Sequence, residues 1–419
     1  MSLDTPASSL SARDPLDPDT AAAAAATVQA TVEKVRSPNV VSVGCCNIDI
    51  TVRVDALPRP GETVVGRSIE NVFGGKGTNQ AVQAALLMAP IESSAETGTE
   101  QHTEDEMAQL RRRKDGQKVA LICKLGNDQF ASDYRQYLSM HQIDTTGVFT
   151  AHGEATGTAL VTVSKDGENT IAYVHGANSS FRPQELLQPS IISLIQKAKV
   201  LLSENGVPPE VSVMALRLAK ESQEDVKTIF TPAPVKDVPL EAFAYCDYVI
   251  LNKSEALALF GVKPIKKVQD KEGHTFVEVD TVDEEWPTIS GSLVKDSPTA
   301  SALREKLRVI GEKALPGLPD RQRGDCNVVM TLGADGCLIS SDAGDVEVLP
   351  QRKVEPQDVV DTVGAGDSFV GAFAYFIGQE ELSLKEAVEK ASIVATYSIQ
   401  KKGASQSYAN RETLRGVIF

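Results

Sequence analysis

The chain has 419 residues, of which 42% are hydrophobic, and a formal net charge of −15 at pH 7. That acidic balance argues against a nucleic-acid-binding surface, and no apolar run is long enough to span a membrane. Six cysteines without a C-x-x-C pair favour small buried side chains in an intracellular protein over a disulfide framework or a zinc site.

Residues 1–37 are rich in alanine, aspartate, serine and proline, with an unbroken alanine run at Ala21–Ala26. This composition predicts a disordered N-terminal extension, and its acidic residues disfavour a mitochondrial transit peptide. We therefore expect a cytoplasmic protein, although import into the nucleus or an organelle stays open. The basic run Arg111–Lys114 is a candidate nuclear signal, but a solvated surface is its simpler interpretation.

The folded part, residues 38–419, opens with an apolar run that predicts a buried strand at Val40–Val43. Asp55–Gly66 contains two prolines and two glycines and predicts a turn with short strands. Residues 91–117 are polar and charged, and we interpret them as a surface insertion. The remaining pattern up to residue 174 predicts a helix, a strand, a second helix and a β-hairpin, at Asn79–Met88, Val119–Leu125, Gln129–Met140 and Thr158–Val174.

From residue 200 onward, predicted strands alternate with predicted helices, interrupted by a second polar insertion at 262–298. Such alternation predicts one mostly parallel sheet with helices on both faces. Ligands of these sheets bind outside the carboxyl ends of the strands. The predicted strands are Val200–Ser203, Thr228–Thr231, Tyr248–Leu251 and Val328–Thr331. The predicted helices are Glu210–Lys220, Glu255–Phe260, Ala300–Ala314, Ser368–Ile377 and Leu384–Ile399.

The most informative motif is D-T-V-G-A-G-D-S-F at Asp361–Phe369. We expect Gly364 and Gly366 to take positive φ and to expose N–H groups at the start of a helix, which makes an anion hole. Asp367 would then be a carboxylate beside bound phosphate, placed to take a proton from an attacking alcohol. The alternative is a glycine-rich turn in which Asp367 is only the N-cap of the helix.

Two motifs near the N-terminal end of the fold predict contacts with a hydroxyl-bearing ligand. Asn47 and Asp49 follow the first strand, and two residues apart in an extended chain they point the same way and can bind adjacent sugar hydroxyls. The alternative for them is an Asx turn. G-G-K-G-T-N at Gly74–Asn79 offers close backbone approach, one cation in Lys76 and one amide. A tight turn with Asn79 as helix cap needs fewer glycines, so we favour a ligand contact.

Two further motifs follow predicted strands. Asn252 and Glu255 are spaced to share the first turn of a helix, where they could hold hydrated Mg²⁺ against phosphates or simply form a capping box. T-L-G-A-D-G at Thr331–Gly336 is either a nucleotide-contacting turn or a hairpin turn into Cys337–Ser340. The five histidines form no metal-spaced cluster.

Together with T-P-A-P at Thr231–Pro234, these motifs occur in the order found in one family, and from about Val40 onward, outside the two insertions, the chain resembles the ribokinase-like (PfkB-type) carbohydrate kinases. The resemblance implies a three-layer α/β/α sandwich with a mostly parallel central sheet. It also implies a small β-sheet lid, with strands at about 51–72 and 155–175, that joins two copies into a homodimer.

The resemblance further implies ATP-dependent phosphorylation of a sugar, and the form G-G-K-G-x-N-Q favours the members that act on the 5-hydroxyl of D-ribose. Asp367 would be the general base, and Gly364, Ala365 and Gly366 the anion hole. The residues implied to bind ribose are Asn47, Asp49, Gly75, Lys76, Asn79 and Asp367. Those implied to bind ATP are Asn252, Thr331, Gly333, Asp335, Gly336 and Gly366.

The resemblance also implies two metal ions. Glu255 would hold Mg²⁺ through water, with the nucleotide. K⁺ would act as a monovalent activator, at positions that correspond here to Asp361, Val363, Ser398, Gly403 and Ser407.

The chain departs from the family pattern in two places. The family has a sugar-contacting glutamate after the strand that matches Val200–Ser203, and here the alignment favours Asn205 or Gly206, with Glu204 slightly early. Thr231 also replaces an asparagine. Two rival functions stay open: a kinase for a related substrate such as deoxyribose or adenosine, and a non-catalytic sugar or nucleotide sensor.

Overall fold

A mixed sheet of nine strands forms the centre of the chain in the computed structural model, which describes residues 38–89, 118–260, 262–269, 275–281, 326–341 and 346–419. Its strand order is β15-β14-β13-β10-β9-β8-β1-β4-β5. The strands are β1 Val40–Val43, β4 Val119–Leu125, β5 Asp144–Thr150, β8 Val200–Glu204, β9 Lys227–Thr231, β10 Tyr248–Asn252, β13 Asn327–Thr331, β14 Cys337–Ser340 and β15 Val346–Leu349.

The strands from β5 to β13 are parallel, and β14 pairs antiparallel with both β13 and β15 at one edge. This confirms the predicted, mostly parallel sheet. Side chains of β1 alternate between two separate cores: Val40 belongs to one, while Val41 and Val43 belong to the other. Since both faces of β1 are buried, the strand reads in sequence as a mostly apolar run in which Ser42 is the one polar residue.

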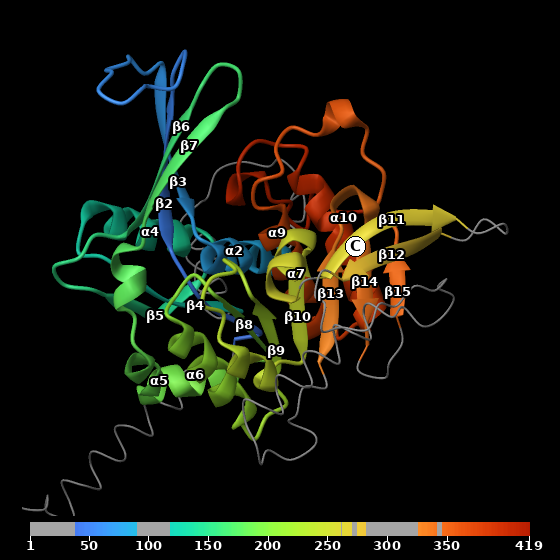
Figure 1. Cartoon of the computed structure of the whole chain (residues 1–419). Helices are drawn as coiled ribbons and strands as arrows, with labels where there is room; N and C mark the ends of the chain where they lie inside the picture. Colours follow the sequence, from blue (N-terminus) through green and yellow to red (C-terminus); the bar gives the residue numbers. More distant parts are fainter. Residues whose placement is uncertain (1–37, 90–117, 261, 270–274, 282–325, 342–345) are drawn as a thin grey trace, which may run out of the picture.

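Helices cover both faces of the sheet (Figure 1). One core gathers side chains from α2, α4, α9 and α10, and the other from α5, α6 and α7. The three-layer α/β/α sandwich is therefore confirmed. The helices are α2 Lys76–Met88, α4 Gln129–Met140, α5 Pro189–Gln196, α6 Pro209–Lys220, α7 Lys253–Phe260, α9 Ala365–Gly378 and α10 Leu384–Ser398.

A second sheet projects from the body beside α2 (Figure 1). It has the order β3-β2-β6-β7, with β2 Asn47–Arg53, β3 Ser68–Gly74, β6 Gly157–Val163 and β7 Asn169–Val174. We call this four-stranded sheet the lid. The β6–β7 hairpin is where the sequence predicted it, but Asp55–Gly66 carries no strand, because it is the loop that joins β2 to β3. Its prolines and glycines suit a loop and not a ladder.

The second predicted insertion contains an antiparallel pair of strands, β11 Val262–Gln269 and β12 Thr275–Thr281. The N-terminal extension, the insertion at 91–117, residues 282–298 and the predicted helix Ala300–Ala314 fall outside the described residues. Strand β5 and helix α5 were not predicted from the sequence.

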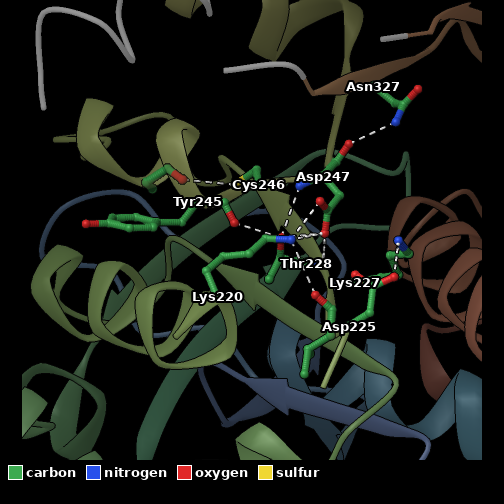
Figure 2. Close-up of polar contacts among 10 residues, drawn as sticks. Lys220, Asp225, Lys227, Thr228, Tyr245, Cys246, Asp247 and Asn327 are labelled. Atoms are coloured by element: carbon green, nitrogen blue, oxygen red, sulfur yellow. Dashed lines mark hydrogen bonds and ion pairs between the residues drawn. The ribbon is translucent and has the colours of Figure 1, made fainter. Parts of the chain in front are cut away.

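A polar network fastens α6 to the amino ends of β9 and β10 (Figure 2). The ammonium of Lys220, the last residue of α6, lies 2.7 and 2.6 Å from the two carboxylate oxygens of Asp247. The Thr228 N–H donates to the same carboxylate at 2.7 Å. Asn327 donates to the Asp247 carbonyl at 3.2 Å. This network lies at the amino ends of the strands, whereas the motifs follow their carboxyl ends, so the role of the network is structural.

All six cysteines are free and buried, as the sequence predicted. In the described part of the chain, no helix combines the length and the apolar character that a membrane crossing requires.

Candidate active site

The predicted site residues converge at the carboxyl end of the central sheet. The chain runs outward from β1 in both directions, to β4 on one side and to β8 on the other, which is the kind of switch point where ligands bind. Residues from neighbouring strands are in register there: Glu204 is opposite Thr231, and Asn252 is opposite Thr331. Above this edge lie the first turns of α2 and α9.

Helix α9 begins at Ala365, three residues earlier than predicted, with Gly364 as its N-cap at φ 76°. Of the two glycines in this motif, Gly364 has a positive φ and Gly366 does not, so the expectation of positive φ at Gly366 is wrong. Gly366 is helical, and a Cβ there would meet no atom within 4 Å. Within the described residues, no protein acceptor takes the N–H of Gly366 or Asp367, so the helix start presents open donors to an anion.

Asp367 is buried in the first turn of α9 and is not its N-cap, so the capping interpretation is wrong. Its carboxylate instead accepts hydrogen bonds from α2, from Asn79 Nδ2 at 3.0 Å and Gln80 Nε2 at 3.2 Å. The amide oxygens of both residues are buried without a partner in the described structure. Asn79 Oδ1 can therefore accept from a ligand hydroxyl. Gln80 was not predicted, although it is the next residue of the same motif.

The glycines of the α2 motif let two backbone segments approach closely. Gly75 is the N-cap of α2 at φ 94°, and a Cβ on it would lie 2.5 Å from the Cys45 carbonyl oxygen. The helix starts at Lys76, so Asn79 lies inside its first turn and is not a cap. The ligand interpretation of this motif therefore fits the geometry better than the capping one.

Lys76 lies in the field of three carboxylates. The Asp367 carboxylate raises the pKa of Lys76 most, and Glu255 and Glu204 add to this rise against the lowering effect of burial. One cation is thus held between the candidate base, a side chain at the end of β8 and a side chain at the start of α7. A positive charge held there can stabilise an anionic group of a ligand.

The structure shows how Glu204 and Asn205, two of the candidates for the sugar-contacting position, lie at the end of β8. Glu204 is fully buried there and accepts the N–H groups of Cys45 and Gly206, while burial raises the pKa of its carboxyl. Asn205 is occupied elsewhere, since its amide donates to the carbonyls of Pro234 and Lys236 at 2.8 and 2.7 Å. Because β8 extends one residue further than predicted, Glu204 is the acidic residue at this edge of the sheet.

Asn47 and Asp49 lie on strand β2, so the Asx-turn interpretation is wrong and the two side chains share a face. Burial raises the pKa of Asp49 to about 6. Gly74 faces this carboxylate across the β2–β3 pair, and a Cβ there would lie 2.5 Å from Asp49 Oδ2. A glycine at position 74 therefore leaves the room that the carboxylate occupies.

On the other side of the site, Asn252 and Glu255 form a reciprocal capping box, with both hydrogen bonds 2.9 Å long. One Glu255 oxygen is left over, and burial raises the pKa of this carboxyl. Among the described residues, no three His, Cys, Asp or Glu side chains gather as a ligand set. A donor set of one carboxylate and one amide fits a hydrated Mg²⁺ that arrives with phosphates better than a protein-enclosed ion.

T-L-G-A-D-G forms the hairpin turn between β13 and β14, with a 3₁₀ turn at Gly333–Asp335. Gly333 is open, because a Cβ there would meet no atom within 4 Å, and the Asp335 carboxylate pairs with Lys253 at 2.9 Å. This pairing fixes the turn against the start of α7. The hairpin interpretation is correct, and it leaves an open glycine surface beside the sheet edge.

The predicted cation loop is partly assembled. Asp361 accepts the N–H groups of Val363 at 3.0 Å and Gly403 at 2.9 Å, and its own N–H reaches the Ile399 carbonyl. The hydroxyls of Ser398 and Ser407 donate to nearby backbone carbonyls instead of to Asp361. Each Asp361 oxygen accepts only one of these N–H groups, so each has a lone pair left that fits a monovalent cation.

The fold and this arrangement define a phosphoryl-transferring sugar kinase, and comparison with known proteins agrees. The family model described as pfkB family carbohydrate kinase matches residues 37–278 and 306–411. The chain belongs to the pfkB family of carbohydrate kinases.

Among individual members of the family, the chain is similar to ribokinases and to a deoxyribokinase. The chain is 33% identical to the ribokinase of Mus musculus over 91% of its own length and 94% of that protein. It is 24% identical to the deoxyribokinase of Salmonella typhi, over 88% of this chain and 95% of that one. Its fold is similar to that of Arabidopsis thaliana ribokinase complexed with ribose and ATP, with a TM-score of 0.68 and 22% identity over 91% of this chain and 99% of that chain.

Proposed function

We propose that this kinase transfers the γ-phosphoryl group of ATP to the 5-hydroxyl of D-ribose. The observation that carries the proposal is the buried carboxylate of Asp367, held by two amides of α2 beside the open N–H groups at the start of α9. The similarity to the mouse ribokinase over nearly its whole length supports ribose as the sugar.

In the proposed reaction, Asp367 accepts the proton of the 5-hydroxyl as its oxygen attacks the phosphorus in line with the leaving ADP. The N–H groups around Gly364, Ala365 and Gly366 bind the oxygens of the group in transfer, where negative charge must be stabilised. Lys76 adds a positive charge beside the same carboxylate.

Asn47, Asp49, Gly75, Lys76 and Asn79 are the proposed sugar contacts, and we add Glu204 to them because it is buried at the same edge of the sheet. The proposed nucleotide contacts are Asn252, Thr331, Gly333, Asp335, Gly336 and Gly366. Glu255 would hold Mg²⁺ through water, and the ion supplies charge neutralisation at the phosphates when it is bound.

We also propose that K⁺ binds at the Asp361 loop. Tyr408 donates its hydroxyl to the Gly364 carbonyl at 2.9 Å, and a Cβ on Gly364 would lie 2.7 Å from Ala404 Cβ. The segment at 403–408 therefore packs directly against the N-cap of α9. A cation that orders this segment would act through the anion hole and not by touching sugar.

The lid is the proposed contact between two copies of the chain. Several large apolar side chains on its strands are exposed, which favours a partner surface. They are Ile69, Leu160, Ile171 and Val174. Light scattering should give twice the chain mass at micromolar concentration, and a strict monomer would contradict the proposal. The free, buried cysteines favour the cytoplasm as the working compartment.

The main alternative is a kinase for 2-deoxyribose, since a deoxyribokinase is among the relatives. A sensor without activity would not need an open anion site beside a buried carboxylate. Purified protein with Mg-ATP, assayed for sugar-dependent ADP release on ribose, 2-deoxyribose, adenosine and fructose, separates these functions. We expect ribose to give the highest kcat/KM, and no sugar-dependent release on any of them would refute kinase activity.

A further inference from the structure

A lid side chain reaches the sugar side of the site. Tyr173, on β7, donates its hydroxyl to Asn47 Oδ1 at 3.1 Å, and its ring packs edge-on against His175 with ring centres 4.7 Å apart. Burial raises the pKa of the Tyr173 hydroxyl, and the nearby Cys45 and Glu204 raise it further. The phenol oxygen therefore lies over the same end of the sheet as the proposed sugar contacts.

Asn178 determines which way the Asn47 amide faces. Asn178 is fully buried, its Oδ1 accepts the Cys46 N–H at 3.0 Å, and its Nδ2 donates to the Cys46 carbonyl at 3.0 Å. These two backbone partners fix the orientation of the Asn178 amide. Its Nδ2 then also donates to Asn47 Oδ1 at 2.9 Å.

The Asn47 side-chain oxygen thus accepts two hydrogen bonds, from Asn178 and from Tyr173. The Asn47 Nδ2 group is left to donate to a ligand. Asp49 lies two residues further on the same face, and its ionised carboxylate can accept hydrogen bonds but cannot donate them. Asn47 can therefore donate to one hydroxyl while Asp49 accepts from its neighbour. The Tyr173 oxygen has given its proton to Asn47, and its lone pair can accept the proton of the hydroxyl that Asn47 donates to.

We propose that Tyr173 is a specificity-determining residue whose phenol oxygen, together with the Asn47 amide, recognises one hydroxyl of a vicinal diol on the sugar. The inference rests on the proposed function, because it takes a pentose as the substrate. In this proposal, a residue of the lid contacts the sugar directly and contributes to its recognition. A sugar that lacks the hydroxyl in question leaves both Asn47 Nδ2 and the Tyr173 lone pair without a partner.

The test combines one substitution in the protein with the removal of single hydroxyl groups from the substrate. Tyr173→Phe removes the phenol oxygen and keeps the ring. Steady-state kcat/KM is measured for ribose and for three analogues that each lack one ring hydroxyl: 2-deoxyribose, 3-deoxyribose and 1,4-anhydroribitol. Losing one neutral hydrogen bond corresponds to a factor of roughly 3–10. We expect Tyr173→Phe to lower kcat/KM by that factor for ribose and for two analogues, and to leave it unchanged for the third.

Tyr245→Phe is the matched control, because Tyr245 lies in the network at the amino end of the sheet (Figure 2). It should change none of the four values. An equal loss on ribose and on all three analogues, or no loss on any, would overturn the role of Tyr173. Neither result would touch the proposed function, which fails only if the unmodified protein does not phosphorylate ribose. Melting curves of both variants confirm that folding is intact.

Discussion

The raised pKa of Asp49 predicts that this residue serves binding at the expense of stability. Burial raises its pKa from the ordinary value of 3.8 to about 6. The folded protein therefore binds this proton more tightly than the unfolded chain does. Above pH 6 the carboxylate is ionised in both states, and its burial costs folding free energy. Below about pH 4 it is protonated in both states, and the cost disappears.

The size of the effect follows from the two pKa values. A rise from 3.8 to about 6 corresponds to about 3 kcal/mol at 1.36 kcal/mol per pKa unit. Asp49 is only partly buried, so water screens its charge and about 1–3 kcal/mol is the expected range. Asp49→Asn, which keeps the shape and removes the charge, should stabilise the ligand-free protein by this amount above pH 6. The two proteins should become equally stable as the pH falls towards 4.

The assay is urea unfolding of both proteins without ligands at pH 4.5, 5.5, 6.5 and 7.5. All other titrating groups are common to the two proteins, so the difference between them isolates Asp49. A stabilisation of the same size at every pH, or none at pH 7.5, would refute the reasoning. The unmodified protein should also show a KM for ribose that rises as the pH falls through about 6, while its KM for ATP stays constant.

The remaining predictions concern three different parts of the molecule. Asp367→Asn should retain the melting temperature and the KM for ATP but lower kcat by at least a factor of about 100, as expected for a general base; a loss below tenfold would reject that role. KCl, titrated against choline chloride in alkali-metal-free Tris at fixed ionic strength, should raise kcat more than it lowers the KM for ribose, and a flat response would reduce Asp361 to a loop anchor. Asp247→Asn should destabilise the fold by about 1–3 kcal/mol in urea unfolding, because it breaks the charged contact with Lys220, and it should leave both KM values unchanged. A changed KM would show that the network at the amino end of the sheet reaches the active site.

Much of the fold could be predicted because its strands are buried on both faces. The apolar runs at Val40–Val43 and Val119–Leu125 gave strands with the bounds that the structure has. Strand β5, D-T-T-G-V-F-T, lies at the edge of the sheet and carries polar residues and a glycine, so no apolar run marks it. Helix α5 is only eight residues long, which is too short for a clear helical period.

The starts of helices α2 and α9 were predicted three residues late for the same physical reason. Gly75 and Gly364 are N-caps with positive φ, and the residues directly after each of them are already helical. Lys76 lies between two glycines and Gly366 is itself a glycine, so the sequence predicted loop at both positions. Both in fact belong to first turns, where backbone N–H groups point at a ligand.

Contacts between distant segments could not be predicted at all. Asn178 meets Asn47 across 131 positions of sequence and Gln80 meets Asp367 across 287, and no local pattern announces either pair. The sequence left open whether Glu204, Asn205 or Gly206 faces the site, because the predicted strand ended at Ser203, whereas β8 runs to Glu204. The sequence therefore indicated the main groups of the candidate site, while the residues that orient those groups come from the structure.

The central claim is phosphoryl transfer to the 5-hydroxyl of ribose, and phosphorus NMR of the product tests it most directly. Purified protein is incubated with Mg-ATP and D-ribose, and the phosphomonoester is observed with proton coupling. We predict one ADP per sugar consumed and a triplet signal, because the 5-phosphate couples to two protons on C5. A doublet, from phosphate on a ring carbon, or ADP release that does not depend on ribose, would contradict the account.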